Sequence, residues 1–430
     1  MSIIYDLVFF AVVIIYLPIY LFKNKFHRGF FLRLGILPKN LALDRPIWIH
    51  AVSVGEAMAV RGLADELRKA LPNKKLVIST VTSTGNKIAK GMAGEGGFIT
   101  YLPLDLGFIV RNVIDRINPS VFIIAETELW PNLISYLYRK NIPAIVVNGR
   151  ISDSSFRGYL AIRFLIKPIL NKITVFCAQA NRDAQRLISL GVSKNKINIT
   201  GNMKFDFKDY ADLKKDYTDY KLRLYLGSKE RLWVAGSTHP GEEEIILGVY
   251  KELSEKIPDL RLLIAPRHPE RAAQVEKLII QYNFKPVRIS QLDTTSHIPA
   301  PTPVFILDTV GQLINYYAIA DIVFVGGSLV KTGGHNILEP ASLAKPVIFG
   351  PHMHNFRDIA ELFLINNAAI QVHNQEELKI NIIYLLRNSS KITKLCQRAK
   401  ELILQNQGAT RRNLEFIKEK VNKKSDGDQG

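Results

Sequence analysis

The fold class follows from one stretch of the sequence, Val121-Phe122-Ile123-Ile124-Ala125-Glu126-Thr127-Glu128. Its apolar residues form a short run without alternation, which is typical of a strand buried on both faces of a parallel sheet. Two carboxylates follow where the strand ends, and the carboxyl ends of parallel strands are where α/β proteins bind ligands. The stretch therefore predicts an α/β protein with a polar site just beyond Ala125.

Comparable apolar runs recur from residue 45 onward and alternate with stretches of helical spacing such as Ala57–Leu71 and Glu242–Lys256. Strands that alternate with helices of this length indicate βαβ units and parallel sheets. A polar segment, residues 208–230, divides the runs into two groups. The first comprises Pro46–Val54, Lys75–Val81, Ser120–Ala125, Ile142–Asn148, Thr174–Ala178 and Ile197–Thr200; the second comprises Leu232–Gly236, Leu260–Ala265, Val304–Leu307, Ile322–Val325, Pro346–Phe349 and Ala369–Val372.

Each group predicts a doubly wound parallel sheet, so we expect two Rossmann-like domains with a ligand-binding cleft between them. We place the first domain at residues 23–207, the linker at 208–230, and the second domain, which includes a C-terminal helix, at 231–421. Residues 422–430 are charged and small, and they predict a disordered tail.

The longest apolar run lies at the N-terminus, Ile3–Phe22, and contains one charged residue, Asp6. A helix of about 20 residues spans the roughly 30 Å hydrocarbon core of a bilayer. Basic residues follow the run and none precedes it, which places the downstream chain in the cytoplasm. We expect residues 1–22 to anchor the chain in the cell inner membrane, either spanning it or lying in its interface, with a buried first helix as the alternative.

The charge balance narrows the possible partners. The 430 residues include 57 Lys and Arg against 39 Asp and Glu, which gives a formal net charge of +18. Such a surplus favours a polyanionic partner, either nucleic acid, an anionic lipid or a phosphorylated substrate. Because the basic residues are spread along the chain and no nucleic-acid module is recognisable, we expect no nucleic-acid partner.

Few side chains are placed to hold a metal. The two cysteines, Cys177 and Cys396, exclude a disulfide framework and a Cys₄ zinc site, and they fit a reducing compartment. The one Asp-x-Asp motif, at residues 426–428, lies in the expected tail, and His352 and His354 have no third ligand near in sequence. We therefore expect neither a metal nor a cofactor.

A carboxylate also follows the first strand, in His50-Ala51-Val52-Ser53-Val54-Gly55-Glu56. Glu56 falls in the first turn of the next helix, where the helix dipole favours a negative charge, so a purely structural role is one interpretation. The other is a general base, since inverting glycosyl transfer needs a carboxylate to take a proton from the attacking hydroxyl.

Two more candidates complete the first half of the chain. Glu126 and Glu128 lie two residues apart in extended chain, so they point to one side and raise each other's pKa unless a cation intervenes. Lys204, in Gly201-Asn202-Met203-Lys204-Phe205-Asp206, follows the last strand and can supply a positive charge to a phosphate or carboxylate. Helix capping, salt bridges and a solvated loop lysine are the alternatives.

Four loops of the second half follow predicted strands. They are Pro266-Arg267-His268-Pro269, Asp308-Thr309-Val310-Gly311-Gln312, Gly326-Gly327-Ser328 and Gly333-Gly334-His335-Asn336-Ile337-Leu338-Glu339. Glycine pairs let backbone N–H groups approach an anion, and a helix start adds partial positive charge. Arg267 and His268 add further positive charge, and Glu339 can accept hydrogen bonds from sugar hydroxyls. Glycines that serve only to make turns are the alternative.

These motifs together resemble those of the 3-deoxy-D-manno-octulosonic acid (Kdo) transferases. The resemblance rests on residues 52–56, 126–132, 201–206, 266–270 and 324–339, and it extends from the N-terminal anchor to Asn406-Gln407-Gly408-Ala409. One departure is visible, because Ile337 and Pro340 stand where the family has proline and alanine.

The resemblance implies a GT-B fold, in which an acceptor domain and a CMP-sugar domain transfer Kdo from CMP-Kdo with inversion. It implies as acceptor a glucosamine hydroxyl of the lipid A precursor (lipid IVA), at the cytoplasmic leaflet, and no metal. Glu56 corresponds to the base, and Glu126 and Lys204 to transition-state support. The implied CMP contacts are Arg267, His268, Val310, Gly311, Gln312, Asn336, Ile337, Leu338 and Glu339, with Glu128, Gly326, Gly327 and Ser328 as supporting candidates.

Two other functions fit part of the same pattern. A GT-B enzyme that uses a UDP-sugar and a lipid-linked acceptor would share the fold, the anchor and the glycine loops. A non-enzymatic basic scaffold at the membrane surface would explain the anchor and the charge, but not the carboxylates at strand ends.

Overall fold

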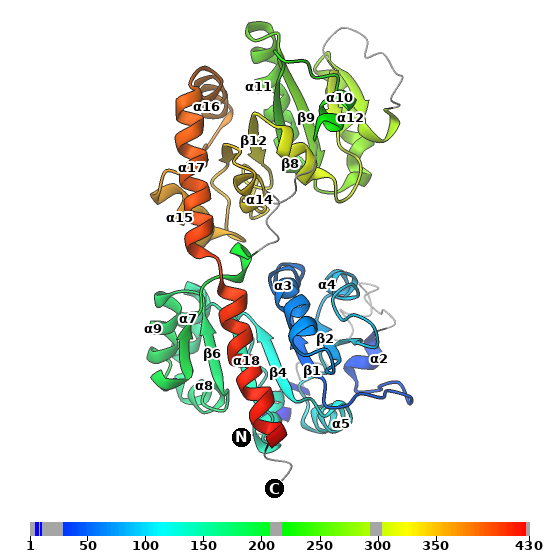
Figure 1. The fold of residues 1–430 in the computed structure, drawn as a ribbon, viewed down its shortest axis with the longest axis vertical. Helices are drawn as coiled ribbons and strands as arrows, with labels where there is room; N and C mark the ends of the chain where they lie inside the picture. Colours follow the sequence, from blue (N-terminus) through cyan, green and yellow to red (C-terminus); the bar gives the residue numbers. More distant parts are fainter. Residues whose placement is uncertain (1–4, 8, 11–28, 207–216, 293–302, 427–430) are drawn as a thin grey trace. The chain divides into compact units, whose positions relative to one another are not determined.

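The structure is a computed structural model that describes residues 5–7, 9–10, 29–206, 217–292 and 303–426. The chain divides into two compact units (Figure 1). The first unit comprises Met1–Lys208 together with Asn406–Gly430, and the second comprises Asp209–Gln405.

The first unit is built on a seven-stranded sheet in the order β3-β2-β1-β4-β5-β6-β7. All of its neighbouring strands run parallel. The strands are β1 (Ile47–His50), β2 (Leu76–Thr80), β3 (Phe98–Tyr101), β4 (Val121–Ala125), β5 (Ala144–Gly149), β6 (Val175–Ala178) and β7 (Ile197–Ile199). The helices are α2 (Phe30–Arg33), α3 (Val54–Ala70), α4 (Ser83–Ala89), α5 (Gly107–Ile117), α6 (Pro131–Arg139), α7 (Asp153–Ala161), α8 (Arg163–Leu170) and α9 (Asn181–Ser189), with short 3₁₀ turns η1 (Lys194–Lys196) and η2 (Met203–Phe205).

Both faces of this sheet are buried, as the unalternating strand sequences predict. Trp48 and Phe122 belong to one apolar core, whereas Ile49 and Ile123, their neighbours in the sequence, belong to the core on the opposite face. Successive side chains of a strand point to opposite faces, so a strand between two helical layers needs apolar residues at every position.

The second unit repeats this plan with a seven-stranded parallel sheet in the order β10-β11-β9-β8-β12-β13-β14. Its strands are β8 (Arg231–Thr238), β9 (Leu260–Pro266), β10 (Lys285–Arg288), β11 (Pro303–Ile306), β12 (Ile322–Val325), β13 (Val347–Phe349) and β14 (Ile370–Gln371). Its helices are α10 (Thr218–Arg223), α11 (Glu242–Lys256), α12 (Ala272–Gln281), α13 (Leu313–Ile319), α14 (Leu338–Ser342), α15 (Arg357–Ile365), α16 (Gln375–Arg387) and α17 (Ser389–Asn406), with the 3₁₀ turns η4 (Pro269–Arg271) and η5 (Ile289–Gln291). Two doubly wound domains are therefore confirmed.

The sequence patterns missed one strand in each sheet. β3 and β10 are both edge strands, paired with a single neighbour. The four residues of β10, Lys-Pro-Val-Arg, include none that is buried. An edge strand does not need the continuous apolar run by which the central strands were recognised.

The C-terminal helix belongs to the first unit, which corrects the expected second-domain boundary at residue 421. In α18 (Ala409–Asp426), Leu414, Ile417 and Val421 are buried in the core that contains Ile49. Figure 1 shows α18 lying along the first unit beside α3. An apolar stripe at helical spacing predicts a buried face but not the sheet against which it packs.

Three other expected boundaries fall partly outside the described residues. Most of the N-terminal run lies outside the described residues. Among the helices that the structure does describe, none is both long and apolar enough to cross a membrane. Residues 207–216 of the expected linker are likewise not described, and the rest of it contains α10. The expected tail begins too early, because α18 continues to Asp426.

Candidate active site

Glu56 lies in the first turn of α3, directly beyond β1. Its carboxylate accepts hydrogen bonds from the backbone N–H of Val52, at 2.7 Å, and from the hydroxyl of Ser53, at 3.1 Å. Burial raises the pKa of Glu56 to about 7, the Val52 donor opposes the rise, and the charge of Glu126 adds to it. A carboxylate with a pKa near the working pH is suited to act as a general base.

Glu126 follows β4 directly and adopts a left-handed backbone conformation, with φ of +58°. This conformation is uncommon for a residue with a long side chain, and it persists only where surrounding contacts hold it. Here the backbone N–H of Glu126 donates to the carbonyl of Val147 in β5, at 2.9 Å. The backbone strain at Glu126 is therefore the cost of placing its charged side chain at the end of β4.

Glu56, Glu126 and Glu128, which we call the carboxylate cluster, are close enough for the charge of Glu126 to raise the pKa of both other carboxyls. In each case burial is the larger cause. Lys204 lies beside the cluster, with its Nζ 3.6 Å from Oε1 of Glu126. Residues from three separate motifs of the sequence thus meet at the carboxyl ends of β1, β4 and β7.

Asn148 is a component of this site that the sequence analysis did not select. Its side chain is fully buried, its φ is +54°, and its Oδ1 accepts the backbone N–H of Met203 at 2.9 Å. This bond fixes the turn that carries Lys204. Its Nδ2 is also buried and makes no hydrogen bond within the described part of the chain. The Asn-Gly pair at the end of β5 was the available signal, since asparagine tolerates a left-handed backbone.

The second unit gathers basic and imidazole groups where β8 and β9 end. Arg267 and His268 are exposed, and the backbone N–H of Arg267 donates to Thr238 at 3.0 Å. Nearby, Nε2 of His239 lies 2.9 Å from Nε2 of His335, with the two rings stacked. Burial lowers the pKa of His335 to about 4, and the charge of Arg267 lowers it further. With both rings neutral, the Nε2–H of one imidazole donates a hydrogen bond to the unprotonated Nε2 of the other.

His239 was also missed from the sequence. It lies in Thr238-His239-Pro240-Gly241, at the end of β8. Like Pro266-Arg267-His268-Pro269, this segment lies at a strand end and contains histidine and proline. Its place in the site becomes evident only in the structure, where the rings of His335 and His268 lie beside the ring of His239.

The loop before α14 presents mainly its backbone and two polar side chains. Ile337 and Leu338 are fully buried, so only their main-chain groups are available to a ligand. Asn336 accepts the N–H of Leu338 at 3.1 Å and donates to Glu339 at 3.2 Å. Burial raises the pKa of Glu339, and the donor from Asn336 opposes that rise.

The loop after β11 is open by contrast. Val310 is 86% exposed and Gly311 has a φ of +83°, a conformation that favours glycine. The Oε1 of Gln312 is buried without a hydrogen-bond partner in the described residues. A buried acceptor without a partner is uncommon in proteins, which makes this loop a candidate for contact with a ligand.

A family model described as 3-deoxy-D-manno-octulosonic-acid transferase (kdotransferase) matches residues 28–207. The chain is 38% identical to the 3-deoxy-D-manno-octulosonic acid transferase of Haemophilus influenzae over 86% of this chain and 86% of that protein. The chain belongs to the Kdo transferase family. It is accordingly a glycosyltransferase, and the function expected from the motifs is confirmed at this level.

Two solved structures resemble this Kdo transferase family member over most of its length and show the fold. A glycosyltransferase from Rickettsia africae matches with a TM-score of 0.54 and 18% identity, covering 88% of this chain and 99% of that one. A putative UDP-N-acetylglucosamine 2-epimerase from Listeria monocytogenes matches with a TM-score of 0.59 and 14% identity, covering 88% and 97%. Both support the pair of parallel-sheet α/β domains.

The glycine loop of this Kdo transferase family member is occupied by the chain itself. The backbone N–H groups of Gly327, Ser328 and Leu329 donate to the carboxylate of Glu242, at 2.6, 2.9 and 2.9 Å. Glu242 is fully buried at the start of α11. The N–H groups of Gly327 and Ser328, which we expected to face an anionic ligand, thus already bind a carboxyl group of the chain, and that of Gly326 donates to the carbonyl of Gly236 at 2.8 Å. These three residues therefore act here by shaping the loop.

Across the residues that the structure describes, no three His, Cys, Asp or Glu side chains gather in a way that could hold a metal ion. Where β8 and β9 end, Arg267 supplies a positive charge, and the neutral imidazoles of His239 and His335 supply hydrogen-bonding groups.

Proposed function

We propose that the chain transfers Kdo from CMP-Kdo to a glucosamine hydroxyl of the lipid A precursor, with inversion and without a metal. The observation that carries this proposal is the carboxylate cluster, in which the pKa of Glu56 is raised to about 7 beside a lysine. Membership of the Kdo transferase family supports the transferred sugar and the glycosyl-transfer chemistry.

Glu56 is the proposed base. The acceptor hydroxyl loses its proton to the Glu56 carboxylate while its oxygen bonds to the anomeric carbon of Kdo. The bond between that carbon and the phosphate oxygen breaks at the same time, and CMP takes the electron pair. With a pKa near 7, Glu56 is largely ionised at slightly alkaline pH and still basic enough to take the proton.

Glu126 and Lys204 are the proposed transition-state support. Positive charge develops on the sugar as CMP leaves, and the ionised carboxylate of Glu126 stabilises it. Lys204, 3.6 Å away, forms an ion pair with Glu126 beside the other two carboxylates. Glu128 adds negative charge to the cluster and so raises the pKa of Glu56 further.

The proposed donor site is in the second unit. Arg267 and His268 hold the single phosphate of CMP, and Val310, Gly311 and Gln312 with residues 336–339 contact the nucleoside. Glu339 and the buried Oε1 of Gln312 are acceptors for its hydroxyl and amino groups. A monophosphate leaving group carries less charge than a diphosphate, so one arginine and a neutral imidazole pair can replace a divalent cation.

The proposed location is the cytoplasmic side of the inner membrane. The apolar N-terminal run and the +18 charge both favour association with a negatively charged leaflet. The lipid A precursor is itself an anionic glycolipid of that leaflet, which fits the same charge.

The direct test is incubation of the full chain with CMP-Kdo and lipid A precursor, with the product analysed by mass spectrometry. We expect a mass increase of one or more Kdo residues, and the spectrum also counts them. In parallel, CMP should raise the melting temperature of the chain and UDP should not. Stabilisation by UDP alone would instead favour a UDP-sugar transferase, and binding of neither nucleotide would favour the scaffold.

A further inference from the structure

The corner between α7 and α8 exposes a group of large apolar side chains. Leu160 is 39% exposed, Ile162 42%, Phe164 74% and Leu165 37%. None of the residues of α7 is buried. α8 packs against the core through Ile166, Ile169 and Leu170. Its outward apolar side chains are therefore exposed on a helix that is itself well packed.

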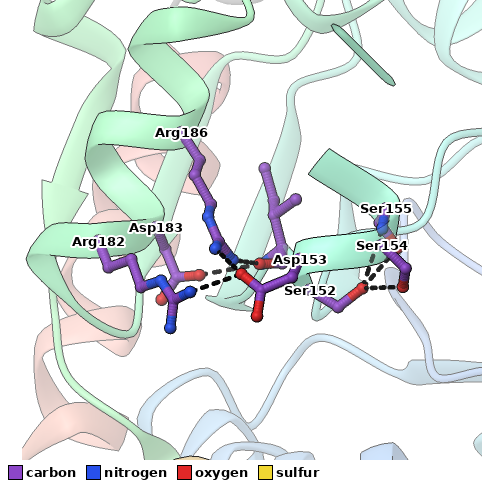
Figure 2. A network of polar contacts seen from close by, with 8 residues as sticks. Ser152, Asp153, Ser154, Ser155, Arg182, Asp183 and Arg186 are labelled. Atoms are coloured by element: carbon purple, nitrogen blue, oxygen red, sulfur yellow. Dashed lines mark hydrogen bonds and ion pairs between the residues drawn. The ribbon is translucent and has the colours of Figure 1, made fainter. Parts of the chain in front are cut away.

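Polar contacts hold the first turn of α7 in place. Figure 2 shows Arg182 and Arg186 of α9 reaching the carboxylate of Asp153, the first residue of α7. Asp183 accepts the backbone N–H of Ile151 at 3.0 Å, and the Ser152 hydroxyl accepts the N–H of Ser155 at 3.1 Å. The first turn of the helix is thus fixed from α9, and Phe156 and Tyr159 pack against the core, whereas Leu160 at the end of the helix is exposed.

Cations surround these apolar side chains. Arg157, Arg163 and Lys167 are all exposed on the same two helices. The sequence from Ser154 to Arg182 contains no Asp or Glu. An exposed apolar surface with a cationic border and no acidic residue is typical of a helix that lies in the interface of an anionic bilayer.

One residue of α7 is near enough to Glu128 to be affected by its charge. Tyr159 lies on this helix, and the charge of Glu128 adds to the burial that raises the pKa of the Tyr159 phenol.

We propose that the α7–α8 corner (Leu160, Ile162, Phe164 and Leu165 with Arg157, Arg163 and Lys167) docks on the surface of an anionic phospholipid bilayer. The apolar side chains enter the interface while the cations contact lipid phosphates. A second copy of the chain would bring like charges together, which disfavours it as the occupant. That the docked bilayer delivers the glycolipid acceptor to Glu56 rests on the proposed function; the docking itself does not.

A fluorophore placed in the corner tests the docking. Cys177 and Cys396 are 0% and 7% exposed, so a thiol-reactive nitrobenzoxadiazole label on an Ile162→Cys variant of the full chain reacts mainly at residue 162. We expect a blue shift and a severalfold rise in emission with phosphatidylglycerol vesicles, and quenching by lipids that carry a spin label. The matched control is Ile365→Cys on α15, whose native side chain is 79% exposed, and it should not respond.

Two outcomes would overturn the proposal. One is an unchanged emission at residue 162 while the chain sediments with the vesicles. The other is a shift that depends on protein concentration without vesicles, which would assign the corner to a contact between two copies.

A kinetic measurement tests the consequence for the acceptor. The double variant Phe164→Ser, Leu165→Ser should raise KM for lipid A precursor in vesicles about tenfold and leave kcat unchanged, whereas Ile365→Ser should change neither. An equal fall in kcat would contradict a docking role. If no variant and no wild-type chain transfers Kdo, the proposed function fails, while the fluorescence result still decides the docking.

Discussion

The two units share one fold plan but present opposite chemistry at their strand ends. The first gathers three carboxylates around one lysine, and burial raises the pKa of Glu56 and Glu128. The second gathers Arg267 and imidazoles, and burial lowers the pKa of His239 and His335. In both units desolvation favours the neutral form. The first unit thereby holds a carboxyl group of near-neutral pKa, and the second holds uncharged hydrogen-bonding groups beside Arg267.

The largest effect should come from removing the proton acceptor. Glu56→Gln keeps the shape of the side chain and its acceptor for the Val52 N–H, but it cannot take a proton. We expect kcat to fall by about 10²–10⁴. CMP affinity, measured by calorimetry, should be unchanged because the proposed CMP contacts lie in the other unit. Turnover near the wild-type value would show that Glu56 is not the base. The difference in chemistry between the two units would then not explain catalysis.

The next largest effect should come from the buried carboxylate of the second unit. Glu242→Gln replaces one acceptor oxygen by an amide that faces backbone N–H donors, so at least one donor loses its partner. Such a loss costs about 1–3 kcal/mol, and more at a charged group, so we expect a lower urea midpoint and weaker CMP binding. The exposed neighbour Glu244 accepts one N–H, which glutamine can also accept, so Glu244→Gln is the control. Equal stabilities of the two variants would contradict the structural role of Glu242.

Loss of the exposed cation should be milder. Arg267→Ala removes a charge-assisted hydrogen bond to the phosphate, worth about 1.5–3 kcal/mol, so CMP affinity should fall by at least about tenfold. The exposed Lys277 of α12 provides the control as Lys277→Ala, which should bind CMP normally. Calorimetry measures both, and equal affinities would exclude Arg267 from the donor site.

The smallest effect should be a shift in pH dependence. The charge of Glu128 is the last of the causes that raise the pKa of Glu56, whose value is about 7. A base acts only when it is deprotonated, so kcat should rise with pH through this region. Glu128→Gln removes a negative charge, lowers the pKa of Glu56 and moves the rising limb to lower pH. A limb that stays in place would show that Glu128 lies outside the electrostatic reach of the base.

Local sequence patterns predicted which charged residues follow strand ends, because each such position lies within one motif. Glu56, Glu126 and Lys204 each follow a strand, and the structure brings them together as parallel strands require. The patterns failed for Asn148 and His239, because the role of each depends on partners more than 50 residues away. They also failed for Gly327 and Ser328, whose N–H groups bind Glu242 from another helix.

The sequence by itself determined the alternation of strands and helices, the two sheets, the charged residues at the strand ends and the family. These are local properties, because apolar periodicity and short motifs are read from neighbouring residues. The tertiary structure alone decided that α18 returns to the first sheet, that Glu242 fills the glycine loop, and that burial brings the pKa of Glu56 to about 7. Each of these depends on which distant groups become neighbours and on how much water they exclude, and no single stretch of sequence contains that information.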